Sequence, residues 1–239
     1  MLLDHNNIVI FSPPRSGTKL LSKILEDAGY HAHGEWFSPR TTYIDGDKAI
    51  RREEYLEYVI SDSEREFKNS MTHYARLKQY KKFDKSVITI WPETLLEFPF
   101  LVEEFKDYHW ACVRRNSWEQ LLSFYITSIN SNFDGLTDSK ATTFQEGTFR
   151  KMYWNYQSAC HLQDWLVENK SATLIDFNDL VSGNAKEISQ SYNVNSKDEH
   201  VDLESLVVNL AHVKNWFKKF EKIHLEYISS QYENNLPNV

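Results

Sequence analysis

The chain has 239 residues, of which 41% are hydrophobic and 14% are aromatic. This length suits one α/β domain, and the apolar content is enough to build its core. The formal net charge of −7 argues against broad nucleic-acid binding through the phosphate backbone. No window reaches the roughly 18 apolar residues of a membrane-spanning helix, and the N-terminus lacks the pattern of a secretory signal. We therefore expect a single cytoplasmic domain over residues 1–239, with no membrane span and no nucleic-acid partner.

Apolar runs rich in β-branched residues alternate along the chain with segments of helical period. The runs predict strands at 8–11, 86–91, 109–113 and 173–175. The periodic segments predict helices at 17–28, 50–79, 94–106, 118–129, 147–168, 185–192 and 213–232. Continuous apolar strands that alternate with helices indicate a three-layer α/β fold, in which helices cover both faces of a mainly parallel sheet. Such sheets bind ligands beyond the carboxyl ends of their strands.

The first predicted strand runs into a loop, Ser-Pro-Pro-Arg-Ser-Gly-Thr-Lys over residues 12–19, that is typical of a phosphate site. Amides at a helix start have no helical partner and carry the positive end of the helix dipole. Gly17 lets the backbone approach an anion closely, and Arg15 and Lys19 add full charges. Ser16 and Thr18 add hydroxyl donors. This P-loop-like strand–loop–helix predicts a site for a phosphorylated nucleotide.

The loop differs from the nucleoside-triphosphatase pattern G-x-x-x-x-G-K-[ST]. Ser12 stands where that pattern has its first Gly, and Gly17 is followed by Thr18 instead of Lys. The only candidate for a Mg²⁺-binding carboxylate after a strand is Asp176, which comes late in the chain. The loop therefore favours a phosphorylated ligand that is not held in the triphosphatase manner.

A second strand–loop–helix is predicted over residues 109–125. Ser117 and Gln120 match a capping box, so the helix is expected to start at Ser117. Arg115 then lies in the loop at the strand end and Ser123 lies two turns into the helix, where the two side chains can hold a second phosphate. By itself this signal is weak, because a surface arginine is the usual explanation of such a residue.

Together the two loops, PPRSGTKLL and RNSWEQLLS, resemble the sulfotransferase family, which uses 3′-phosphoadenosine 5′-phosphosulfate. In that family the first loop, P-[RK]-[SG]-G-T, holds the 5′-phosphosulfate, and the second, R-[ND]-P-x-x-x-x-x-S, binds the 3′-phosphate. The resemblance implies that the 3′-phosphate contacts Arg115 and Ser123. For the phosphosulfate it implies Arg15, Ser16, Gly17, Thr18 and Lys19.

The chain also departs from the family pattern. Ser117 replaces the proline of the second loop, which removes no ligand. Phe177 stands in a segment that looks like the family's Y-E-D-L, whose aromatic residue lies near the adenine; it can stack but has no hydroxyl to donate. The late R-K-G loop of the cytosolic members is absent from the sequence.

Sulfuryl transfer needs a base for the proton of the acceptor hydroxyl. In cytosolic members of the family this base is the His of a T-H-x-P segment, but here Ile90 occupies its place. Glu35, in Glu-Trp-Phe, resembles the proposed base in the P-x-E-[FYW]-F segment of a trehalose-type bacterial branch. Neighbouring aromatic rings would raise the pKa of this carboxyl by desolvation. A surface glutamate beside a hydrophobic anchor, or a base at His31 or His33, stays open.

The alternation of His31, His33 and Glu35 would place all three on one face of an extended strand. A metal site there is conceivable. The sequence places no fourth ligand, however, and the family needs no metal, so we expect none.

The resemblance thus implies an enzyme that moves a sulfuryl group from 3′-phosphoadenosine 5′-phosphosulfate to a hydroxyl of a carbohydrate or small molecule. Arg15 and Lys19 would neutralise charge on the bridging and leaving oxygens, and Glu35 would deprotonate the acceptor. One alternative is a P-loop kinase, which would bind ATP with Mg²⁺. Another is a nucleotide-binding protein of the same fold without catalysis.

Overall fold

The structure, a computed structural model, describes residues 1–34, 42–45, 48–51, 84–97, 99, 101–130, 139–188, 192 and 202–235. The chain forms two compact units. Unit 1 comprises Met1–Arg114 and Leu162–Asn195, and unit 2 comprises Arg115–His161 and Ser196–Val239. A single domain over the whole chain stays a prediction. None of the helices in the described ranges has the length and apolar character needed to cross a bilayer.

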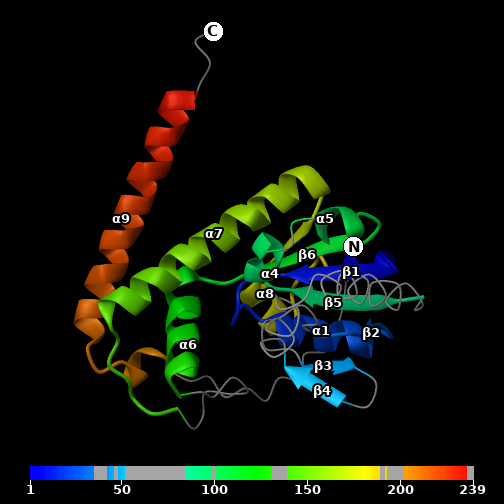
Figure 1. The fold of residues 1–239 in the computed structure, drawn as a ribbon, viewed down its shortest axis with the longest axis horizontal. Coiled ribbons are helices and arrows are strands. Elements are labelled where there is room, and N and C mark those ends of the chain that lie inside the picture. The colour runs from blue at the N-terminus through cyan, green and yellow to red at the C-terminus, as the bar shows by residue number, and fades with distance from the viewer. Residues whose placement is uncertain are drawn as a thin grey trace, which may run out of the picture. The chain divides into compact units, whose positions relative to one another are not determined.

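Unit 1 is built on a five-stranded sheet whose strands all run parallel. The strand order is β2-β5-β1-β6-β7, and Figure 1 shows β1 between β5 and β6. The bounds are β1 Asn7–Phe11, β2 His31–Ala32, β5 Ser86–Ile90, β6 His109–Arg114 and β7 Thr173–Asp176. The α/β fold with a parallel sheet is therefore confirmed, as are the four predicted strands. The short edge strand β2 was not predicted.

Helices cover both faces of this sheet. They are α1 Thr18–Asp27, α4 Pro92–Glu97, α5 Leu101–Glu104, α8 Phe177–Ser182 and the end of α7 Glu146–Lys170. Alternate strand residues point to opposite faces: Ile8 and Ile10 pack with α1 and α8, whereas Val9 and Phe11 pack with α4, α5 and α7. This alternation buries every residue of β1 after Asn7 and confirms the three-layer arrangement.

Two predicted helices of unit 1 are wrong in part. The segment 94–106 forms the two short helices α4 and α5, because Pro99 lies between them and cannot continue a helix. The segment 185–192 shows only a single turn in its described part, where the Ile188 amide donates to the Ala185 carbonyl. The Ala185 amide donates to the Tyr192 hydroxyl at 3.2 Å, so a side chain satisfies the first amide of this turn.

A two-stranded antiparallel pair, β3 Thr42–Asp45 and β4 Lys48–Arg51, forms a separate small sheet. The predicted helix at 50–79 is wrong at its start, because Ile50 and Arg51 belong to β4. The rest of that segment lies outside the described residues.

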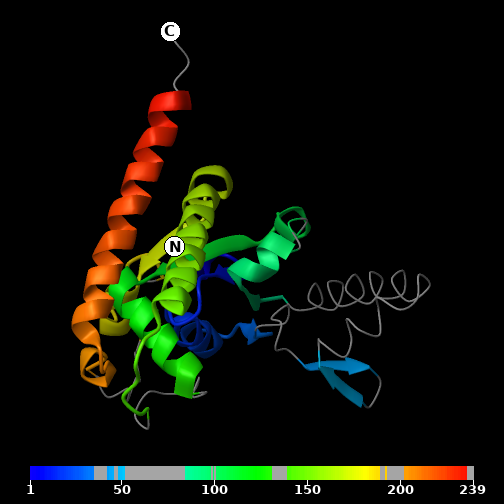
Figure 2. The same ribbon diagram turned by 60° about the vertical axis from the view of Figure 1, so that its left-hand side comes forward.

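Unit 2 is helical and has an aromatic core. It contains α6 Ser117–Asn130, the first part of α7, a short 3₁₀ turn at Glu204–Leu206 and α9 Leu210–Asn235, drawn in orange to red in Figure 2. Tyr125 stacks on Phe144 with 3.8 Å between ring centroids, and the fully buried ring of Tyr153 contacts Phe217 and Phe220. The helices predicted at 118–129, 147–168 and 213–232 are confirmed.

Candidate functional site

The first loop connects β1 to α1 through an unusual backbone. Arg15 has φ +67° and Gly17 has φ +93°, both in the left-handed region. Gly17 is the N-cap of α1, and among the described residues no side chain caps this helix start. The amides of the first turn therefore face outward, and the helix dipole favours an anion in front of them.

Ser16 lies between these two left-handed residues. Its side chain is fully buried, yet within the described part of the chain its hydroxyl has no hydrogen-bond partner. Leaving a buried hydroxyl unpaired costs about 1–3 kcal/mol. Such a cost is typical of a ligand site, because an oxygen of a bound anion can accept this bond. The predicted phosphate loop thus contains a buried donor in need of an acceptor.

Phe177 packs directly on this loop. A Cβ atom added to Gly17 would lie 2.8 Å from Cδ2 of the Phe177 ring and 3.0 Å from Cε2. Residue 17 must therefore be glycine for two reasons, its positive φ and this close contact. Stacking of Phe177 on an adenine stays a prediction. In the structure the ring belongs to the first turn of α8 and its edge covers the backbone of Gly17.

Ser12, which replaces the first Gly of the triphosphatase pattern, has a structural partner on the next strand. Its hydroxyl donates to the Phe11 carbonyl at 2.6 Å and accepts from the Val113 amide at 2.7 Å. The residue is fully buried. The hydroxyl thus ties the carboxyl end of β1 to β6, and sequence reasoning missed this bond because its two residues lie 101 positions apart.

The strand order places this tie at the topological switch point of the sheet. From β1 the chain passes through α1 to β2, on the side of β5, whereas from β6 it continues to β7 on the opposite side. Ligands of open parallel sheets bind in the crevice outside the carboxyl ends of such diverging strands. The first loop follows β1 and therefore begins at this crevice.

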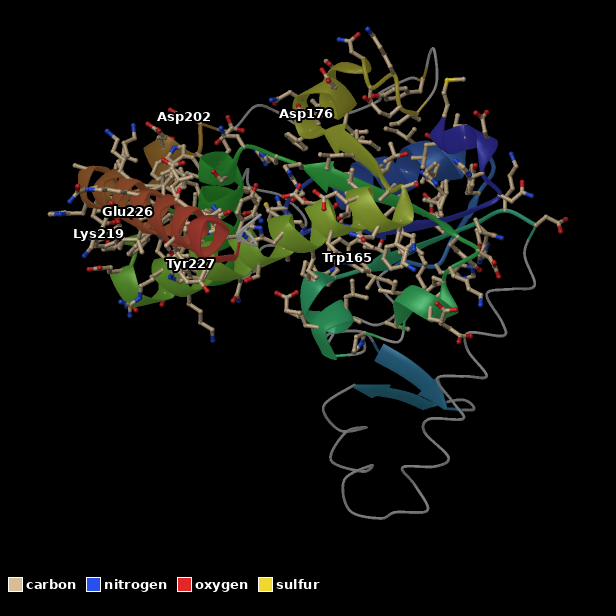
Figure 3. All side chains as sticks on the ribbon, turned by 90° about the horizontal axis from the view of Figure 1, so that it is seen from above. Trp165, Asp176, Asp202, Lys219, Glu226 and Tyr227 are labelled. Carbon is tan, nitrogen blue, oxygen red and sulfur yellow. The ribbon has the colours of Figure 1, made fainter. Side chains whose placement is uncertain are left out.

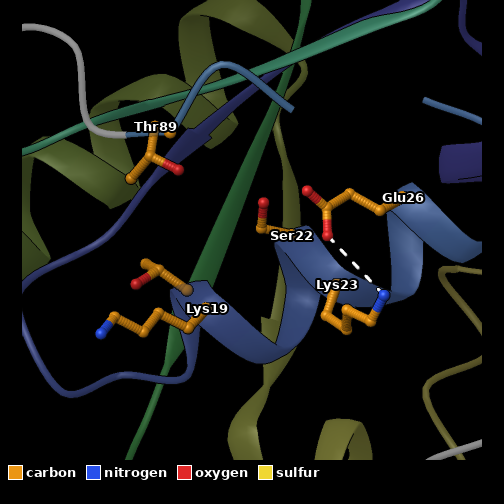
Figure 4. Close-up of a pocket in the computed structure, with 7 residues that line it drawn as sticks. Lys19, Ser22, Lys23, Glu26 and Thr89 are labelled. Carbon is orange, nitrogen blue, oxygen red and sulfur yellow. Dashed lines mark ion pairs between the residues drawn. The ribbon is translucent and has the colours of Figure 1, made fainter. Parts of the chain in front are cut away.

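A cavity of about 400 Å³ lies beside the first turns of α1. Figure 4 shows Ser22 and Glu26 on successive turns of α1, and Thr89 of β5 also lines the cavity. Lys23 pairs with Asp27 at 2.9 Å and with Glu26 at 3.9 Å. The lining is Thr18, Lys19, Ser22, Lys23, Glu26, Gly34 and Thr89. Hydroxyl, ammonium and carboxylate groups thus continue from the phosphate loop along one face of α1.

The second loop begins α6 as predicted, but with a different cap. Helix α6 starts at Ser117, while the Asn116 side-chain oxygen accepts from the amides of Trp118 at 3.0 Å and Glu119 at 3.3 Å. The expected capping box of Ser117 and Gln120 is therefore wrong, and Asn116 is the N-cap. Ser117 is the first helical residue, and an amide at that position has no helical acceptor. A proline at position 117, as in the family pattern, would therefore remove no helical hydrogen bond.

Arg115 and Ser123 both belong to unit 2, and their surroundings differ. The Arg115 guanidinium bonds Glu119 through Nε at 3.3 Å and Nη2 at 3.2 Å. Burial lowers its pKa, and Glu119 partly offsets this. Ser123 is fully buried within α6. A phosphate at Arg115 would therefore share the guanidinium with Glu119 or displace it, and contact with Ser123 requires the covering side chains to move.

The alternation predicted for His31 and His33 is confirmed by their rings, which meet edge to face with 4.6 Å between centroids. Burial, and secondarily the neighbouring His31, lower the pKa of His33 to about 4. His33 is thus neutral near pH 7 and able to take a proton, although weakly basic. Glu35 lies outside the described residues. No group of three or more metal-binding side chains occurs within the described ranges.

Asp176, the one candidate for a Mg²⁺ ligand, has another role. It is the last residue of β7 and the N-cap of α8 (Figure 3), where its carboxylate accepts from the Asn178 amide at 2.7 Å. Strand β7 is separated from β1 by β6. The two strands that pair with β1 end at Ile90 and Arg114, so neither places a carboxylate at its final residue.

Comparison of the chain with known protein families finds no family model that matches, and comparison with curated proteins likewise finds no match. The structure supports an α/β fold with a parallel sheet that is compatible with nucleotide-binding folds.

Proposed function

We propose that the protein is a sulfotransferase that uses 3′-phosphoadenosine 5′-phosphosulfate. The observation that carries this proposal is the conformation of the first loop. Arg15 and Gly17, both with left-handed backbones, flank Ser16, whose buried hydroxyl has no hydrogen-bond partner among the described residues. The loop leads into a helix start that no described side chain caps. Two further features support it. The loop follows the central strand at the switch point, and its sequence resembles the phosphosulfate loop of this family.

In the proposed reaction the sulfuryl group passes from the 5′-phosphate to an acceptor hydroxyl. The bond between sulfur and the bridging phosphate oxygen breaks, and its electron pair stays on that oxygen. Arg15 and Lys19, with the amides of the first turn of α1, stabilise the charge that develops there. A new bond joins sulfur to the acceptor oxygen, whose proton passes to Glu35 or, alternatively, to His31 or His33.

The cavity along α1 is the proposed site of the acceptor. It begins at Thr18 and Lys19, where the sulfuryl group would lie, and extends to Glu26. At 1.5 Å per residue, this stretch of helix is about 12 Å long. That length accommodates a sugar or a small alcohol, and Ser22 and Glu26 offer hydrogen bonds to further hydroxyl groups.

The position of Asp176 disfavours the kinase alternative. A P-loop kinase holds Mg²⁺ with a hydroxyl of the loop and an acidic residue at the end of a strand. Here Asp176 ends β7, which β6 separates from β1, and its carboxylate caps α8; the two strands beside β1 end at Ile90 and Arg114. We therefore expect the nucleotide phosphates to be neutralised by arginine and lysine.

Calorimetric titration with adenosine 3′,5′-bisphosphate tests the donor. We expect binding that is unaffected by EDTA and at least about tenfold tighter than that of 5′-AMP, since the 3′-phosphate adds a charged contact. Equal affinity for the two nucleotides would remove Arg115 and Ser123 from the proposal. Tight binding of ATP that requires Mg²⁺ would replace the proposal with the kinase.

Sulfate transfer from 3′-phosphoadenosine 5′-phosphosulfate to a panel of sugars and small alcohols tests catalysis. Glu35→Gln should leave bisphosphate affinity nearly intact and lower turnover about a hundredfold or more. Near-normal turnover would move the base to His31 or His33. Tight bisphosphate binding without transfer to any acceptor would favour a binding protein without catalysis.

A further inference from the structure

Gln163 is a fully buried polar residue near the end of α7, in unit 1. Its Nε2 donates to the Val113 carbonyl at 3.0 Å and to the Phe11 carbonyl at 3.4 Å. Its Oε1 accepts from Nε of Arg114 at 3.1 Å. A buried carboxamide with three polar contacts is costly to replace, because each partner would lose its bond away from water.

These contacts lie where the ladder between β1 and β6 ends. The paired residues are Ile8 with His109, Val9 with Trp110 and Ile10 with Ala111. Beyond the last pair, side chains connect the strands in place of backbone bonds: Ser12 joins the Phe11 carbonyl to the Val113 amide, and Gln163 joins the two carbonyls. Gln163, which belongs to α7, thus bridges the ends of β1 and β6 at the switch point of the sheet.

Arg114 fixes the direction in which the carboxamide points. Its Nε can only donate, so the Gln163 atom that faces it must be the carbonyl oxygen. The NH₂ group is then directed toward the two strand carbonyls. Asp164, the next residue of α7, holds the same guanidinium through Nη2 at 2.8 Å. The orientation of Gln163 is therefore set by an ion pair at the end of β6.

We infer that Gln163 is a positioning residue for the phosphate loop. Its hydrogen bond to the Phe11 carbonyl fixes the last residue of β1, directly before the loop that begins at Ser12. The position of this strand end determines where Arg15, Ser16 and Gly17 can contact an anion. That the anion is a nucleotide phosphate rests on the proposed function. The positioning of the loop rests on the contacts alone.

The test compares Gln163→Met with Leu166→Ala. Methionine is close to glutamine in size but donates no hydrogen bond. Leu166 lies one turn further along α7, is equally buried and belongs to the core on the same helix, so its truncation lowers stability without removing a bond to β1. Both variants are compared with the wild type by hydrogen exchange without ligand and by bisphosphate titration, at temperatures equally far below their own melting points.

In Q163M we expect the amides of Ser12 and of residues 15–19 to exchange about tenfold faster than in L166A, while amides of α9 exchange alike in both. Bisphosphate affinity should fall about tenfold in Q163M and less than about threefold in L166A. Equal loop exchange in the two variants would overturn the inference. If the wild type fails to bind the bisphosphate, the proposed function fails, while the exchange comparison still decides the role of Gln163.

Gln163→Glu separates the two sides of the carboxamide. A carboxylate retains the bond from Arg114 and loses both bonds donated to the strand carbonyls. We expect loop exchange in Q163E to be at least as fast as in Q163M at pH 8. Exchange as slow as in the wild type would show that the bond from Arg114 suffices, and would overturn positioning through the Phe11 carbonyl.

Discussion

Replacement of Gly17 by alanine should harm both stability and nucleotide binding, for reasons that can be separated. The φ of +93° costs alanine about 1–2 kcal/mol. The added Cβ also meets the Phe177 ring at 2.8 Å and the Leu180 side chain at 3.4 Å. Overpacking of this kind costs about 1–3 kcal/mol. We therefore expect Gly17→Ala to lower the free energy of unfolding by about 2–5 kcal/mol.

Gly29 offers a matched control for the backbone term. Its φ is +91°, and an added Cβ would meet nothing within 4 Å. Gly29→Ala should therefore cost only the conformational part, about 1–2 kcal/mol. In a Phe177→Ala background, Gly17→Ala should fall to the same value because the clash is gone, which gives a coupling of about 1–3 kcal/mol between residues 17 and 177.

Urea unfolding monitored by tryptophan fluorescence measures these differences, and bisphosphate titration of the folded variants measures binding. Gly17→Ala should weaken binding far more than Gly29→Ala, because only residue 17 lies in the loop. Equal destabilisation by the two glycine variants, or a Gly17→Ala cost that is the same with and without Phe177, would refute the close packing of this ring on the loop.

Three other substitutions test separate features. Ser16→Ala should leave stability unchanged or slightly raised, since its hydroxyl has no partner within the described residues, and should weaken bisphosphate binding about tenfold by calorimetry. Asn116→Ala should cost about 1 kcal/mol in urea unfolding, whereas Ser117→Ala should be nearly neutral. Burial lowers the pKa of His109 to about 4, so between pH 6.5 and 4 the unfolded chain binds more protons than the folded chain. The free energy of unfolding should therefore fall as pH falls through that window, and His109→Gln should make this pH dependence shallower in urea unfolding measured at several pH values.

The elements of the fold could be predicted where a local pattern determines them. The apolar run of β1 and the helical period of α6 were found because burial on a sheet or one helix face imposes a period on the sequence. Strand β2 has two residues, too few for any period. The predicted helix at 94–106 runs across Pro99, although a proline is a local signal for the break between α4 and α5.

The residues of the candidate site also differ in whether a local sequence pattern predicts them. The loop residues Arg15 to Lys19 are contiguous, so their composition alone indicates an anion. Asn116 and Ser117 are both good caps, and only the structure decides between them. The contacts of Gln163 join residues 152 and 50 positions apart, and nothing in the periodicity of α7 marks a glutamine that reaches two strand ends.

Ser12 connects the departure from the triphosphatase pattern to the proposed chemistry. Glycine at this position has no side chain to join the Phe11 carbonyl to the Val113 amide. The Ser12 hydroxyl uses its hydrogen bonds to connect β1 with β6 and not to bind the ligand. The donors left for the ligand begin at Arg15 and are cations, amides and the hydroxyls of Ser16 and Thr18. Such a set can neutralise a leaving phosphate without a carboxylate-bound metal, as the proposed sulfuryl transfer requires. A Mg²⁺-dependent kinase instead uses the metal ion to neutralise the phosphate charge.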